Sequence, residues 1–64
     1  MNQSTASRRQ VRVVFETHNG DFRSRYLDIT ARPGDSAQTL RTRAGDAFRR
    51  RYGINQRIVA IHLS

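Results

Sequence analysis

The dipeptide Asn19-Gly20, which separates two strand-like runs, constrains the fold of this chain more than any other feature of the sequence. In the first run, Val11, Val13 and Phe15 occupy every second position, which is the period of a β-strand with one buried face. Asn-Gly tolerates the positive φ angles of tight hairpin turns. The sequence therefore predicts a β-hairpin, with strands over residues 11–17 and 22–30 joined by a turn over 18–21.

The length of this turn decides which side chains of the second strand face inwards, because a shift of one residue reverses every side chain. A two-residue turn would place Phe22 and Tyr26 against the core, with Arg12, Glu16, Arg23 and Arg25 on the outer face. A three-residue loop with Gly20 as a bulge would instead place Leu27, Ile29 and Ala31 inside and both aromatic residues outside. We favour the three-residue loop, because the apolar pair Leu27 and Ile29 would otherwise lie on the open face.

A helix is predicted after the second strand, which Arg32-Pro33-Gly34 ends. Asp35 occupies the expected N-cap position, with Gln38 as its capping-box partner and Gly53 as the C-cap. Residues that recur at three- and four-residue spacing line one face of this helix, namely Ala37, Leu40, Ala44, Ala47, Phe48 and Tyr52. Residues 57–63 form a third predicted strand, with Val59, Ile61 and Leu63 on one side.

These elements predict an α+β domain of the ββαβ type. A right-handed crossover through the helix makes the second and third strands parallel if the first lies between them, which gives a three-stranded antiparallel sheet of order 2-1-3 with the helix packed on one face. We expect one domain over residues 10–64, preceded by a disordered basic arm over residues 1–9. A domain this small buries only about 60% of its surface, and the chain has no cysteine for a disulfide.

The charge of the chain indicates an anionic partner. All twelve basic residues are arginine, against five acidic residues, so the formal net charge is +7. A GC-rich genome would explain the missing lysine but not the excess of positive charge. Guanidinium groups match phosphate and carboxylate geometry. The expected contacts to nucleic acid or to an acidic partner are Arg8, Arg9, Arg12, Arg23, Arg25, Arg41, Arg43, Arg49, Arg50 and Arg51.

Two alternatives limit this interpretation. Arginines in the last turn of a helix also complement the helix dipole, and Asp46 could form an ion pair with Arg50 one turn away. The open sheet face is a second candidate surface: we expect it to carry Arg12 with Arg23 or Arg25 and, in the three-residue-loop register, also Phe22 and Tyr26, which are candidates for stacking on unpaired bases. In a chain with only five aromatic residues, however, each of them is also a candidate for the core.

The sequence offers no support for catalysis, a metal or a cofactor. His18 and His62 are far apart in the chain, and no residue pattern supplies an acid and base pair or an activated nucleophile. No segment is apolar enough for a membrane span or a secretion signal. We therefore expect a non-enzymatic protein of the cytoplasm.

Four segments of the chain follow one another in the same order as in a known group of proteins. They are the apolar first strand, the segment Leu27-Asp28-Ile29-Thr30-Ala31, the helix through Leu40 and Ala44, and the last strand Val59-Ala60-Ile61. In this order they resemble very small phage-encoded ββαβ proteins, among them an inhibitor of bacterial RNA polymerase and several anti-CRISPR proteins. That polymerase inhibitor relies on acidic residues, whereas this chain is basic. The resemblance implies a phage- or mobile-element-encoded binder that blocks a nucleoprotein machine in the host cytoplasm.

Three functions remain open from the sequence. The first is binding of nucleic acid phosphates through arginine patches. The second is inhibition of a host nucleoprotein complex by docking on an acidic protein surface. The third is a structural role as a homodimer joined through an edge strand, since a small sheet leaves strand edges unpaired.

Overall fold

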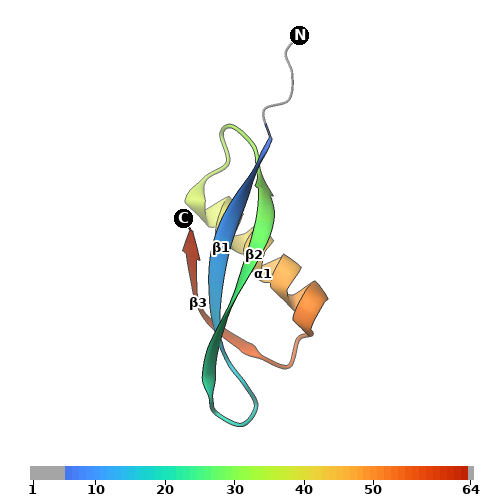
Figure 1. Cartoon of the computed structure of the whole chain (residues 1–64). Coiled ribbons are helices and arrows are strands. Elements are labelled where there is room, and N and C mark those ends of the chain that lie inside the picture. Colours follow the sequence, from blue (N-terminus) through green and yellow to red (C-terminus); the bar gives the residue numbers. More distant parts are fainter. Residues whose placement is uncertain (1–5, 64) are drawn as a thin grey trace.

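A β-hairpin forms the first half of the computed structural model, which describes residues 6–63. β1 (Ser7–Glu16) and β2 (Phe22–Ala31) pair antiparallel along their whole length, from Ser7 opposite Ala31 to Glu16 opposite Phe22. The tip of this hairpin extends beyond the helix (Figure 1). The long ribbon places ten residues of β2 at an edge of the sheet.

The hairpin has the register that the three-residue loop predicts. The backbone N–H of Thr17 donates to the carbonyl of Asp21 at 2.8 Å, and the N–H of Gly20 donates to the carbonyl of Thr17 at 2.9 Å. Gly20 has a φ of +89°, the left-handed conformation that such a bulge requires. Val13 consequently lies opposite Arg25, and Leu27, Ile29 and Ala31 are buried.

The predicted disordered arm is wrong for its last three residues. β1 begins at Ser7, because the end of β2 supplies partners for Ser7, Arg8 and Arg9, which lie opposite Ala31, Thr30 and Ile29. Pairing with a neighbouring strand thus orders a segment that has no apolar periodicity of its own. Residues 1–5, the remainder of the predicted arm apart from Ala6, lie outside the described residues.

The N-cap of the helix α1 (Ala37–Tyr52) lies one residue later than predicted. Ser36, not Asp35, is the N-cap, and its hydroxyl accepts a hydrogen bond from the N–H of Thr39 at 3.1 Å. The Asp35 carboxylate is already engaged, since it accepts from the N–H of Arg32 at 2.8 Å. Gly53 is the C-cap as predicted, with a φ of +91° and its N–H donating to the carbonyl of Arg49.

The third strand, β3 (Arg57–Leu63), pairs antiparallel with the other side of β1, so the sheet has the predicted order β2-β1-β3. A bulge separates the pairs Val14–Ala60 and Phe15–Ile58, which leaves Val59 as the extra residue. Val59 is therefore exposed, and Ile58 packs against the core in its place. The prediction that Val59 shares a face with Ile61 was wrong for this reason.

The core lies between the sheet and α1, which crosses one face and leaves the other uncovered (Figure 1). Each of β1, β2 and α1 contributes three buried hydrophobic residues, which are Val11, Val13, Phe15, Leu27, Ile29, Ala31, Leu40, Ala44 and Phe48. The ring of Phe48 lies 4.9 Å from that of Phe15 and 5.0 Å from that of Tyr52, measured between centroids. Within residues 6–63, no helix has the length and hydropathy that crossing a bilayer requires.

Candidate functional site

The alternation of β2 sorts its side chains onto two faces. Arg23 and Arg25 lie opposite Phe15 and Val13, whose side chains are buried, and therefore point to the helix side of the sheet. Arg12 lies opposite Tyr26, and both belong to the uncovered face. The expectation that Arg12 shares one open face with Arg23 or Arg25 was therefore wrong.

Three arginines from two elements gather where α1 ends. The guanidinium carbon of Arg25, from β2, lies 5.6 Å from the ring centroid of Tyr52, and that of Arg51, from α1, lies 5.7 Å from the same centroid. Arg50 is exposed beside Arg51. None of these three arginines forms an ion pair with a carboxylate among the described residues. We call Arg25, Arg50 and Arg51 the helix-end cluster.

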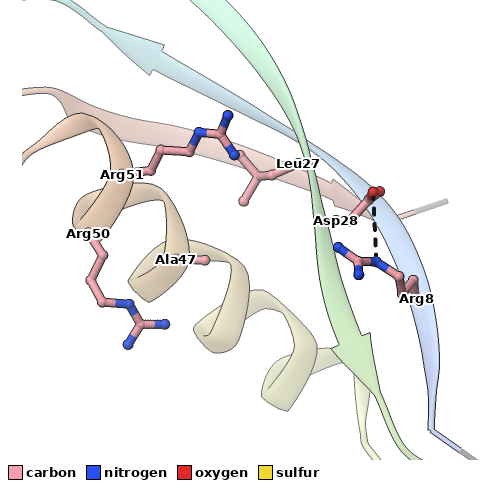
Figure 2. Close-up of a pocket in the computed structure, with 6 residues that line it drawn as sticks. All are labelled: Arg8, Leu27, Asp28, Ala47, Arg50 and Arg51. Carbon is pink, nitrogen blue, oxygen red and sulfur yellow. Dashed lines mark ion pairs between the residues drawn. The ribbon is translucent and has the colours of Figure 1, made fainter.

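An open hollow of about 370 Å³ lies between α1 and β2 next to this cluster. Leu27 and Ala47 line it, and Figure 2 shows Arg51 extending from α1 towards Leu27 while Arg50 points away from the sheet. Arg8 also lines the hollow, across β2, where it faces Asp28 at 4.0 Å. Because the guanidinium groups diverge, the site is an extended positive surface and not a pocket for one ion.

Arg43 does not belong to this surface. Its guanidinium donates to the carboxylate of Asp35 at 2.8 Å and to the carbonyl of Thr30, at the end of β2. These bonds tie the start of α1 to the sheet. The hydrogen bond from Arg43, followed by that from the N–H of Arg32, lowers the pKa of Asp35 below its usual value. Two hydrogen bonds from Nη1 of Arg43 hold its guanidinium group against the end of β2 and the Asp35 carboxylate, so this arginine is less available for partner binding than those of the helix-end cluster.

The remaining ion pairs leave their arginines accessible. Arg8–Asp28, Arg23–Asp21 and Arg57–Glu16 have nitrogen–oxygen distances of 4.0, 3.9 and 3.9 Å, and the arginine side chains are 62–82% exposed. Such pairs contribute about 0–1 kcal/mol and exchange readily for other anions. In the described part of the chain, Asp46 does not form the predicted ion pair with Arg50.

Other predicted residues lie apart from the cluster. Arg41 and Arg49 line the side of α1 that faces β3, together with Gly45, Ile58 and Ile61. Arg9 is half-buried on the helix side of β1, opposite Ile29. Tyr52 was not among the residues predicted for the site, because its helical spacing indicated a core residue. Its position directly after three arginines was the available signal.

The uncovered face carries a second group of predicted residues. Phe22 and Tyr26 are 66% and 63% exposed. Arg12 is half-buried between Tyr26 of β2 and His62 of β3, its partners on either side.

No three histidine, aspartate or glutamate side chains within residues 6–63 are grouped so as to hold a metal ion. No family model, curated protein or solved structure matches this chain.

Proposed function

We propose that this protein binds nucleic acid through its phosphates, without enzymatic chemistry, and that the helix-end cluster makes the main contacts. The observation that supports the proposal is that Arg25 and Arg51 meet at the Tyr52 ring, next to Arg50 in the same helical turn, and that none of the three has an ion pair among the described residues. Each guanidinium presents a planar set of donors that fits phosphate oxygens. Neutralised phosphates release counterions, which supplies affinity without reading base sequence.

The helix dipole does not account for this arrangement. A cation in the last helical turn stabilises a helix by about 0.3–1 kcal/mol, which could explain Arg50 or Arg51. Arg25 belongs to β2, however, and lies beside the same Tyr52 ring. Bringing a strand arginine to the helix end raises the local positive potential, which favours an anionic ligand over a purely local role.

Salt dependence of binding tests the proposal. Affinity for a fluorescent duplex is measured by anisotropy from about 50 to about 200 mM KCl, and the logarithm of the association constant should fall linearly with the logarithm of the salt concentration. With three phosphate contacts the slope is about −2.7, and R50Q/R51Q should bring it to about −0.9. R32Q/R41Q removes the same charge near the start of α1 and should change the slope far less.

Two results would contradict the proposal. One is the lack of any binding at low salt, and the other is an equal loss in the two double variants, which would indicate net charge alone. The alternative partner, an acidic protein surface of a host nucleoprotein complex in the cytoplasm, is tested by capture from bacterial lysate. Capture of the same protein before and after nuclease treatment, without binding to purified nucleic acid, would replace nucleic acid by that partner.

A further inference from the structure

The edge strand β2 separates aromatic from cationic side chains within five residues. Phe22 and Tyr26 lie on the uncovered face, whereas Arg23 and Arg25, which alternate with them, lie on the helix side. Within the described chain β2 pairs only with β1, so its outer edge is open. A ligand that runs along this edge meets rings on one side and guanidinium groups on the other.

The core does not require these two rings. It is filled by Phe15 and Phe48 with Tyr52 against them, whereas Phe22 and Tyr26 are exposed. Single exposed apolar residues are common on protein surfaces. Two aromatic residues four positions apart on the same strand face, about 13 Å along the strand, can each meet a base of one extended single strand.

A positive charge accompanies one of the rings. Arg12 is the cross-strand partner of Tyr26, and it makes no ion pair within residues 6–63. The cross-strand partner of Phe22 is instead the acidic residue Glu16, whose carboxylate lies 3.9 Å from the guanidinium of Arg57. Tyr26 therefore combines a free aromatic face with a neighbouring cation, and it is the stronger of the two stacking positions.

We propose that the uncovered sheet face and the open edge of β2 bind single-stranded nucleic acid, with bases stacked on Tyr26 and Phe22, and with phosphates beside Arg12 on that face and Arg25 across the edge. This inference rests on the proposed function and names its substrate class. Unpaired bases have free faces for stacking, whereas those of a duplex are already stacked on one another. A second copy of this chain is a poorer occupant, since a symmetric contact would bring Arg12 and a net charge of +7 against themselves.

Alanine substitution separates stacking from phosphate binding. Y26A and F22A should each weaken binding of a labelled single strand by about 5- to 150-fold, the range for loss of one stacked base. Binding of a duplex should change less than about twofold, because the phosphate contacts are intact. Y26F should retain single-strand affinity. V59A, which truncates another exposed apolar residue, serves as the matched control and should bind like the original protein.

The outcomes distinguish this inference from the proposed function. If neither single strand nor duplex binds, both fail. If both bind but Y26A and F22A leave single-strand affinity unchanged, or weaken duplex binding equally, the stacking site is overturned while phosphate binding stands. Sedimentation over a range of protein concentrations tests whether a second copy of the chain occupies this face instead. A dimer that Y26A dissociates would overturn the inference. Urea unfolding of each variant confirms that the fold is retained.

Discussion

Gly45→Ala should stabilise this protein, although Gly45 is buried in the middle of α1. Glycine in a helix interior is less favourable than alanine by about 1 kcal/mol, because its backbone loses more freedom on folding. A Cβ placed on Gly45 would lie 3.4 Å from Nη1 of Arg49 and 3.8 Å from the Cδ1 atoms of Ile58 and Ile61. These are ordinary contacts, and the nearest atom ends a flexible side chain.

The expected gain is therefore about 1 kcal/mol, which in a domain of this size raises the Tm by about 4–8 °C. The adjacent A44G variant is the control, because Ala44 is fully buried and helical. It loses the same helix preference and a buried methyl group, so the unfolding free energy should fall by about 2 kcal/mol. Urea unfolding followed by circular dichroism measures both. A lower stability of G45A would show that α1 approaches β3 too closely for a methyl group, and would refute this reasoning.

Three further substitutions test other parts of the fold. Phe48→Ala removes a fully buried ring and should cost about 3–5 kcal/mol, enough to abolish the dispersed NMR spectrum of so small a domain. Gly20→Ala should lower the unfolding free energy by about 1 kcal/mol and Asn19→Ala should not, because only Gly20 of this turn has a positive φ; equal effects would indicate a two-residue turn. Asp35→Asn should lower the urea midpoint at pH 7. Because the folded-state pKa of Asp35 is lowered, its contribution is complete above about pH 4 and is lost as the pH falls through the folded pKa, so a difference that does not shrink as the pH falls below about 4 would contradict the assigned role.

Local patterns in the sequence determined the elements and their order. Alternation over residues 11–15 predicted β1, Asn19-Gly20 predicted the hairpin, and helical spacing from Leu40 to Phe48 predicted the buried side of α1. These signals are local, because each depends on the period of one element or on the φ preference of one residue. The strand order followed from them through the handedness of the crossover.

The sequence also predicted that Phe22 and Tyr26 are exposed, but only through a choice between two registers. That choice compared the burial of Leu27 and Ile29 with the burial of the aromatic pair, and the structure agrees with it. The same register sends Arg25 to the helix side. Keeping Arg25 on the open face beside Arg12 was inconsistent with the alternation of a strand.

Contacts between distant segments were decided only by the tertiary structure. Arg43 reaches the carbonyl of Thr30 and the carboxylate of Asp35, which holds its guanidinium group away from the helix-end cluster. Arg25 and Arg51 meet at Tyr52, although 26 positions separate the two arginines in the chain. A long arginine side chain reaches whichever acceptor or ring the packing of the helix on the sheet brings near it. The periodicity of a single element carries no information about the distance between a guanidinium group and a partner on another element.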